Sequence, residues 1–232
     1  NERMIKKAYG DVIDSTPLKK INVIISAYDS AEFLQDCLDS IESQTYKPNR
    51  ILLGIDGCKK TLDKALEIAK KYSNLEIYYA EENRGPYQMF NSLAELVSDD
   101  EYIQRFDSDD IMYSNLLEEM SKYNVPTVSR HDGILFLKKE VLNLVGGFRD
   151  WKCAADSDMV FRLQKALGNK VLRIPKYYVR RTHDKQLTKK AETCIGSKLR
   201  LGYIDIYSEN VNSINPDVYI KPVCNYIIRI LF

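Results

Sequence analysis

Residues 21–41 read INVIISAYDSAEFLQDCLDSI, and this segment decides the class of fold. Five of its first seven residues are apolar and four are β-branched, which is typical of a strand buried on both faces of a sheet. Beyond the polar turn Tyr28-Asp29-Ser30, apolar residues recur at helical spacing, at Phe33, Leu34, Cys37, Leu38 and Ile41. This spacing is that of an amphipathic helix, for which Ser30 is a candidate N-cap. The segment therefore predicts a strand followed by a helix.

The same alternation continues through the first half of the chain. Further strands are expected at residues 51–55, 75–80 and 101–106, and further helices at residues 62–72 and 89–96. Strands that alternate with helices form βαβ units, so we predict an α/β fold of Rossmann-like type, with a mainly parallel central sheet flanked by helices. Ligands of such sheets bind beyond the carboxyl ends of the strands. We expect three loops to meet there, namely those with Tyr28-Asp29, Asp56-Gly57 and Asp107-Ser108-Asp109-Asp110.

The second half of the chain is less regular. It predicts a strand at residues 133–137, helices at residues 138–145 and 157–167, and strand and loop at residues 171–179. We divide the chain into an N-terminal extension (1–20), an α/β domain (21–190, with halves of about 21–110 and 111–190) and a C-terminal helical tail (191–232). The apolar end, residues 226–232, is expected to pack on the domain, with contact to another subunit or to a membrane as the alternatives. Because the chain begins at Asn1 without an initiator methionine, we expect additional domains outside it.

Composition excludes several classes of protein. The 232 residues contain 34 Lys and Arg against 33 Asp and Glu, and a net charge of +1 argues against general nucleic-acid binding. The five cysteines form no CxxC pair, which indicates reduced thiols in the cytoplasm. With only two histidines, His131 and His183, the chain cannot form a multi-histidine metal site. It also lacks a GxxxxGK[ST] loop, a GxGxxG fingerprint, a GxSxG elbow and an apolar run of about 20 residues.

The acidic cluster Asp107-Ser108-Asp109-Asp110 is the strongest local signal of chemistry. Six acidic residues lie between Asp99 and Asp110, and Arg105 is the only basic residue among them. Carboxylates gathered at a strand end repel one another unless a cation neutralises them. Mg²⁺ and Mn²⁺ bind to such carboxylates together with phosphate oxygens of a substrate. A solvated acidic loop is the plainer alternative, but the position directly after an apolar strand favours a metal site.

Two further segments carry candidate functional groups. Asp156 and Asp158 open a predicted helix, where they act either as helix caps or as a general base facing the metal. His183 lies among basic residues in Arg180-Arg181-Thr182-His183-Asp184-Lys185, a setting suited to phosphate. His131 has no such surroundings, and we interpret it as a surface or loop residue.

The order of these motifs resembles that of the family 2 glycosyltransferases, which have the GT-A fold. The opening strand and turn, the helix ending in Gln44-Thr45-Tyr46 and the acidic cluster match the family's first strand, first helix and DxD motif. The remaining matches are Ile55-Asp56-Gly57-Cys58, Asn83-Arg84-Gly85 with Asn91, Gly146-Gly147-Phe148, Asp156-Ser157-Asp158 with Arg162, and Arg180 with His183, Leu187 and Thr188. The chain departs from the family pattern at Asp29 (Asn in the family), Ile55 (Asp), Cys58 (Ser) and Ala155 (Glu). The resemblance covers about residues 20–190.

The resemblance implies an inverting, metal-dependent transfer of a hexose or N-acetylhexosamine from a nucleotide-diphosphate sugar, with a UDP-sugar as the expected donor. In this interpretation Tyr28 stacks on the base, Asp56 hydrogen-bonds to it and Arg84 approaches the diphosphate. Asp109 is the main ligand of Mn²⁺ or Mg²⁺, His183 adds a contact, and Asp107 binds the metal or the ribose. Asp156 is the general base that deprotonates the acceptor. Further expected contacts are Ser26, Ala27 and Ser108 to the donor, and Asp158, Asp110, Trp151 and Arg181 around the acceptor or behind these groups.

Two other functions stay open at this point. A nucleotidyltransferase that makes sugar nucleotides also gathers acids at a strand end, but it needs a Gly-rich, Arg-bearing loop after the first strand, which residues 26–30 lack. A catalytically inactive sugar-nucleotide or glycan-binding module is the second alternative. For the transferase we expect a glycan, lipid-linked or protein acceptor, a role in polysaccharide biosynthesis and a cytoplasmic location, with peripheral membrane contact as an option. No nucleic acid is expected as a partner.

Overall fold

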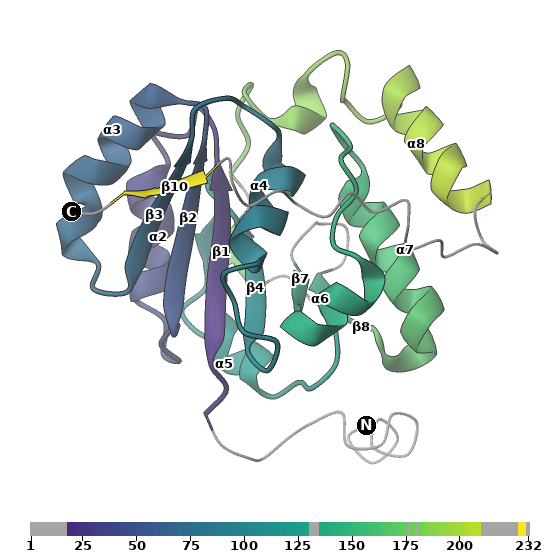
Figure 1. Cartoon of the computed structure of the whole chain (residues 1–232), viewed down its shortest axis with the longest axis horizontal. Coiled ribbons are helices and arrows are strands. Elements are labelled where there is room, and N and C mark those ends of the chain that lie inside the picture. Colours follow the sequence, from purple (N-terminus) through teal and green to yellow (C-terminus); the bar gives the residue numbers. More distant parts are fainter. Residues whose placement is uncertain (1–17, 130–134, 176, 180, 210–226, 231–232) are drawn as a thin grey trace.

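The computed structural model describes residues 18–129, 135–175, 177–179, 181–209 and 227–230. Four parallel strands form its centre (Figure 1): β1 (Ile21–Ala27), β2 (Arg50–Asp56), β3 (Leu75–Ala80) and β4 (Tyr102–Asp107). β1 lies between β2 and β4, and β3 lies beyond β2. The connection from β3 to β4 therefore crosses β1, and the strand order reverses between β1 and β4. At such a reversal the adjoining loops leave in opposite directions, which opens a crevice at the carboxyl ends of the strands.

The remaining strands of the sheet extend it on both sides. Next to β4 follow β7 (Leu135–Lys138) and β6 (Thr127–Ser129), each antiparallel to its predecessor, and then β8 (Leu172–Ile174), parallel to β6. At the opposite edge β10 (Ile227–Ile230) pairs antiparallel with β3, so that a strand from the last residues described joins the sheet of the first half (Figure 1).

Helices cover both faces of the sheet (Figure 1). Val23 and Ile25 of β1 pack with α2 (Leu34–Glu42), α3 (Lys59–Ile68) and α5 (Leu116–Ser121). Ile24, which lies between them in the strand, packs instead with α4 (Pro86–Ala94), α6 (Lys139–Val145) and α7 (Ala155–Leu167). This alternation follows from the pleat of a strand, whose successive side chains point to opposite faces. α8 (Lys198–Glu209) lies beside α7, and the 3₁₀ turns are η1 (Ala69–Lys71), η2 (Gly168–Lys170) and η3 (Leu187–Lys189).

A second, two-stranded sheet joins distant parts of the chain. β5 (Ile111–Met112) comes directly after the acidic cluster and pairs antiparallel with β9 (Tyr178–Val179). Gln44, at the end of the first helical segment, fixes the loop after β5: its Nε2 donates to the Tyr113 carbonyl at 2.8 Å, and its Oε1 accepts from the Leu117 amide at 3.0 Å. Asp110 and the segment that begins at Arg181 are thereby held close together.

The predicted α/β fold with a mainly parallel sheet is confirmed, and the differences concern the ends of elements. α3 begins at Lys59 rather than at residue 62, because its first turn is exposed and carries no apolar signal. Ser30 does not cap α2 with its side chain: its carbonyl accepts from the amides of Phe33 and Leu34, and Phe33 is the N-cap. In the region expected to be a helical tail, α8 is a helix but residues 227–230 form a strand, because their backbone pairs with the edge strand β3. Residues 133 and 134 of the strand predicted at 133–137 lie outside the described residues.

Membrane-spanning helices were sought among the residues that the structure describes. None of the helices there has the length and apolar character that a bilayer crossing requires.

Gly54 in β2 provides a test of the packing between the sheet and α4. A Cβ at this position would overlap the thioether of Met89 and contact Leu93. We expect Gly54→Ala to lower the free energy of unfolding by about 1–3 kcal/mol, because the core is already filled there. Gly202→Ala in α8 is the matched control, since a Cβ there meets nothing within 4 Å; it should raise stability by up to about 1 kcal/mol. Urea unfolding of both variants measures the difference, and equal effects would contradict this packing.

Candidate functional site

A cavity of about 700 Å³ opens at the carboxyl ends of β1, β2 and β4. Its wall also includes the start of α4, the turn before α7 and residues 183–200. Most of the residues predicted from the sequence line it: Ser26, Tyr28, Asp56, Arg84, Asp107, Ser108, Asp109, Asp110, Trp151, Asp156 and His183. Asp109, Asp156 and His183, which are far apart in the sequence, thus share one cavity. Ala27, Asp158 and Arg181 are not part of its wall.

The acidic cluster is held by a basic side chain of its own strand and by a backbone amide of a distant segment. Asp107 Oδ1 lies 2.8 Å from Nη2 of Arg105, a buried residue of β4. Burial opposes the charge of Arg105, but Asp107, followed by Tyr87 and Asp156, outweighs it and raises the pKa of the guanidinium. Asp110 is buried and accepts from the backbone amide of Arg181 at 3.1 Å. The buried cation therefore reduces the repulsion that this cluster would otherwise create.

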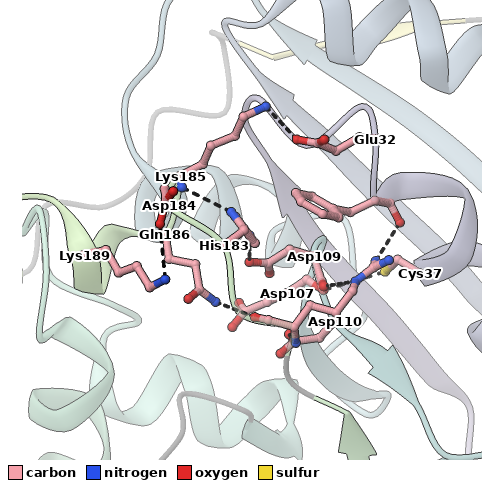
Figure 2. Close-up of polar contacts among 12 residues, drawn as sticks. Glu32, Cys37, Asp107, Asp109, Asp110, His183, Asp184, Lys185, Gln186 and Lys189 are labelled. Carbon is pink, nitrogen blue, oxygen red and sulfur yellow. Dashed lines mark hydrogen bonds and ion pairs between the residues drawn. The ribbon is translucent and has the colours of Figure 1, made fainter.

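Asp109 and His183 lie in direct contact in the cavity wall, as Figure 2 shows. The Nε2 atom of His183 lies 2.7 Å from Oδ2 of Asp109. The backbone amide of Lys185 donates to Nδ1 of the same ring at 3.2 Å. Because Nδ1 is an acceptor here, a neutral ring carries its hydrogen on Nε2 and donates it to Asp109. A metal ion at Nε2 would need that hydrogen to move, and the Lys185 amide would then have to turn away from Nδ1.

Asp109 and His183 together fit a divalent cation that takes its other ligands from a substrate. Among the described residues, no three His, Cys, Asp or Glu side chains are grouped closely enough to hold a metal ion by themselves. The predicted set of Asp109, Asp107 and His183 is therefore not assembled, because Asp107 turns to Arg105. Mg²⁺ and related ions are often held by only one or two protein carboxylates, with phosphate oxygens and water as the remaining ligands. Asp109 with His183 is compatible with that arrangement.

The basic segment, residues 181–190, lies against the β1 loop and the start of α2 (Figure 2). Arg181 donates from Nε to the Asp109 carbonyl and from Nη2 to the Phe33 carbonyl at 2.8 Å. The Phe33 ring stacks on His183 with centroids 4.4 Å apart. Although Arg181 does not line the cavity, it fixes the backbone that presents Asp109.

Lys185 continues this attachment of the basic segment to the β1 loop. Its Nζ lies 2.7 Å from a carboxylate oxygen of Glu32 and 3.3 Å from Oδ1 of Asp29. The hydrogen bond to Glu32, followed by Asp29, raises the pKa of Lys185 against a small desolvation. Asp29, which stands where the family has Asn, adopts a left-handed conformation with φ of 47°. The basic segment thus closes one side of the cavity by charge pairing.

Asp56 holds the turn that precedes α4. Its two carboxylate oxygens accept from the backbone amides of Arg84 and Gly85, at 2.9 and 2.8 Å. The side chain is only 1% exposed. Burial raises the pKa of Asp56, and the two amides and the charge of Arg84 oppose this rise. Asp56 therefore has a structural task in addition to any contact with a ligand.

The other residues predicted to bind a donor differ in accessibility. Tyr28 is 51% exposed at the cavity, with Nζ of Lys190 at 5.9 Å from its ring centre. Ser26 and the buried Ser108 lie at the ends of β1 and β4. Arg84 reaches toward solvent, where its Nη2 lies 3.6 Å from Glu82. Ala27 is fully buried in the core, so its side chain is not available to a ligand.

Asp156 lies in the first turn of α7, where Oδ1 accepts from the Ser157 amide at 2.9 Å. The hydroxyl of Tyr87, in the first turn of α4, lies 3.4 Å from the same oxygen. Tyr87 is a buried residue that sequence reasoning missed, because an aromatic residue at the start of a helix is most often core. Arg105 was also noted only as the single base among the acids, although it lines the cavity.

Asp158, only two residues away, has a different environment. It is fully buried and pairs with Arg162, whose Nε donates to Oδ2 at 2.8 Å, and with Arg149 at 3.4 Å. Arg162 also donates to the carbonyls of Val145 and Gly147, which ties α7 to the Gly146-Gly147-Phe148 turn. Trp151 lines the cavity and stacks on Tyr203 of α8, with centroids 4.4 Å apart. The sequence-predicted positions Arg180 and His131 lie outside the described residues.

Comparison with known structures identifies the class of fold. S. aureus TarS 1–349 in complex with UDP-GlcNAc matches with a TM-score of 0.69 and 16% identity, over 84% of this chain and 68% of that one. The mannosyltransferase PcManGT from Pyrobaculum calidifontis, in complex with GDP-Man and Mn²⁺, gives a TM-score of 0.66 and 15% identity over 97% and 78%. The fold is thus that of the GT-A glycosyltransferases.

Sequence comparison then gives the family. The sequence model described as "Glycosyl transferase family 2" matches residues 22–124. Glycosyltransferase GlyA of Streptococcus pneumoniae serotype 4 is 34% identical over 106 residues, 44% of this chain and 15% of GlyA. Glycosyltransferase GlyG of the same organism is 28% identical over 100 residues, 43% of this chain and 33% of GlyG. Residues 22–124 thus match glycosyl transferase family 2, and the chain aligns with a third or less of the length of these relatives.

The neighbouring carboxylates Asp156 and Asp158 allow a matched test of the site. We expect Asp158→Asn to lower the free energy of unfolding by about 3–5 kcal/mol, because it leaves buried guanidinium groups without their counter-charge. Asp156→Asn should change it by no more than about 1 kcal/mol, since that side chain is only half-buried at a helix start. Urea denaturation of both variants decides the matter: similar losses would contradict the division into a structural and a site carboxylate.

Proposed function

We propose that this chain transfers a sugar from a nucleotide-diphosphate sugar to an acceptor hydroxyl, with inversion at the anomeric carbon. The observation that carries this proposal is the convergence of Asp109, His183 and Asp156 on one cavity at the reversal of strand order. The match of residues 22–124 to the family and the GT-A fold support it. The complexes of neighbours with UDP-GlcNAc and GDP-Man support nucleotide sugars as the class of donor.

The donor is proposed to lie across the ends of β1, β2 and β4. Tyr28 is exposed enough to stack on a base, and Asp56 keeps further lone pairs for a base hydrogen bond beside the two amides that it already binds. Ser26, Ser108 and Asp107 are placed to meet the ribose, and Arg84 to meet the diphosphate. A UDP-sugar carrying a hexose or N-acetylhexosamine is our proposed donor.

Charge on the diphosphate has to be neutralised for it to leave. Asp109 and His183 are the residues that would hold Mn²⁺ or Mg²⁺, and Lys185 and Lys190 line the same wall. Such an ion, when bound, supplies electrostatic stabilisation of the departing diphosphate. The complex of PcManGT with Mn²⁺ supports use of a divalent ion. Arg105 balances Asp107, so that the carboxylate beside the donor does not repel its phosphates.

Asp156 is proposed as the general base. It takes the proton of the acceptor hydroxyl while the oxygen attacks the anomeric carbon, and the bond from that carbon to the diphosphate oxygen breaks. A single displacement of this kind inverts the configuration without a covalent intermediate. The acceptor, a hydroxyl of a glycan, a lipid-linked sugar or a protein, would enter beside Trp151. We place this reaction in the cytoplasm, with peripheral membrane contact where the acceptor is lipid-linked.

Asp156→Asn should abolish transfer and leave donor binding intact. We expect kcat to fall by about 10²–10⁴, because the acceptor loses its base. The dissociation constant of the donor should stay within about a factor of two, because Asn keeps the volume of the side chain and an oxygen acceptor. A panel of UDP- and GDP-sugars, screened by thermal stabilisation, identifies the donor, and calorimetry and product release then measure both quantities. Unchanged turnover would remove Asp156 from the mechanism, and a wild-type protein that binds a donor but transfers nothing would favour an inactive binding module.

Asp109→Ala should abolish the metal-dependent part of nucleotide binding. We expect calorimetry with UDP to show a Mn²⁺-dependent gain in affinity for the wild type that EDTA removes, and no such gain for the variant. Asp184→Ala is the control, because Asp184 belongs to the same region but is fully exposed and pairs with Lys189; it should behave like the wild type. Equal affinity of the wild type with Mn²⁺ and with EDTA would contradict the metal site.

A further inference from the structure

Asp156 and Tyr87 meet at the boundary between the two helical segments that frame the cavity. The Tyr87 hydroxyl lies 3.4 Å from Oδ1 of Asp156, and both residues line the cavity. This oxygen also accepts from the Ser157 amide, so the carboxylate has donors from two different helices. The contact with Tyr87 is long, as hydrogen bonds in active sites without substrate often are before they shorten in the complex.

The position of Tyr87 is fixed by its surroundings. Its ring is buried and packs on Phe148 with centroids 5.2 Å apart. Asn91 holds Phe148 in turn, because its amide group donates to the Phe148 carbonyl at 2.8 Å and accepts from the Phe148 amide at 2.9 Å. The packing of the ring therefore fixes the Tyr87 hydroxyl in its position beside Asp156.

The start of α4 is set from the opposite side of the cavity. Asp56 accepts from the amide of Gly85, the N-cap of α4, which has a φ of 93°. Pro86 follows at the first helical position, and Tyr87 is the next residue. Asp56 beside the donor and Asp156 beside the acceptor are thus connected through one short, well-held turn.

Several charged and titratable groups surround this contact. Arg105 of β4, Arg200 of α8 and Cys153 of the turn before α7 line the same part of the cavity, and the charge of Asp107 also reaches Tyr87. Burial, followed by the charge of Asp156, raises the pKa of Tyr87 far above that of an exposed tyrosine. Tyr87 consequently keeps its proton at neutral pH and can only donate toward a charged Asp156.

We infer that Tyr87 is a positioning residue, which holds the Asp156 carboxylate oriented toward the acceptor through a hydrogen bond from its phenol group. This inference rests on the proposed role of Asp156 as the base. It also gives a physical reason why the site can lack the family's Glu at position 155: Ala155 is fully buried, and the partner of the base comes from α4 instead.

Tyr87→Phe tests the inference, because it keeps the ring and its packing on Phe148 and removes only the donor. We expect kcat to fall about 5–10-fold with an unchanged KM for the donor. In the dependence of kcat on pH, the midpoint of the acidic limb should rise by about half a pH unit to one pH unit, since a carboxylate without a hydrogen-bond donor is easier to protonate. Carboxyl ¹³C NMR of Asp156 should show the same upward move of its protonation midpoint, and this readout does not depend on activity.

Tyr72→Phe is the matched control. Tyr72 is also buried and donates to a carboxylate, that of Asp39 at 2.7 Å, but it belongs to the core on the opposite face of the sheet. Tyr72→Phe should lower the free energy of unfolding without moving the midpoint of the acidic limb of kcat or the NMR midpoint of Asp156.

The two proposals fail in different ways. If Tyr87→Phe leaves the Asp156 midpoint and the acidic limb where they are in the wild type, the inference about Tyr87 is overturned, whatever the activity. If the midpoint moves but the wild type transfers no sugar, the contact between Tyr87 and Asp156 stands and the proposed transferase function fails. If kcat falls equally in both Tyr→Phe variants without any midpoint change, the effect is general destabilisation and the inference is overturned.

Discussion

The parallel pairing of β1 with β4 is the constraint on which the site depends. In its register Ser26 lies opposite Asp107, so the two loops that follow these strands begin side by side. The chain reaches β4 from β3, which lies on the other side of β1 in the sheet. The loops after β1 and β4 therefore leave in opposite directions and leave room between them. A shift of one residue in this register would turn the side chains of β4 to the opposite faces of the sheet and carry Arg105 and Asp107 together away from the cavity. The buried strands thus determine where the carboxylates of the cavity can lie.

The second requirement of the site is that the charges of these neighbouring carboxylates are compensated. Each acid at the edge of the sheet meets a donor: Asp107 meets Arg105 of the same strand, whereas Asp110 meets the Arg181 amide and Asp109 meets His183, both from a distant segment. The basic segment pairs in addition with Asp29 and Glu32 through Lys185. These partners allow several carboxylates to stay close to one another in the folded protein. Asp109 and His183 form a pair in the wall of the open cavity. An additional cation would gain the most electrostatic stabilisation beside this pair.

Much of this could be predicted from the sequence, because hydrophobic periodicity and strand-end acids report local structure directly. The strands through residue 107 and the meeting of Asp109, Asp156 and His183 follow from the βαβ pattern and the ordered motifs. What the sequence could not reveal is the partner to which each side chain turns. Asp107 was expected to bind the metal or the ribose, but its carboxylate pairs with Arg105, and Asp158, expected around the acceptor or behind it, lies buried against Arg162. Tyr87 escaped notice because nothing in its local sequence distinguishes a core tyrosine from one that reaches a carboxylate.

The short ladder of β5 and β9 has a consequence for how this protein can change. The chain leaves the first half after Ile111-Met112 and returns at Tyr178-Val179, and these two pairs of residues lie side by side. Everything between them, including α6 and α7, is therefore a single excursion that starts and ends at one point next to the acidic cluster. The strands and helices of this excursion are tied to the sheet by the pairing of β7 with β4 and by the packing of α6 and α7 in the core. Changes of length are therefore best tolerated in its loops, where they need not move Asp109 or His183.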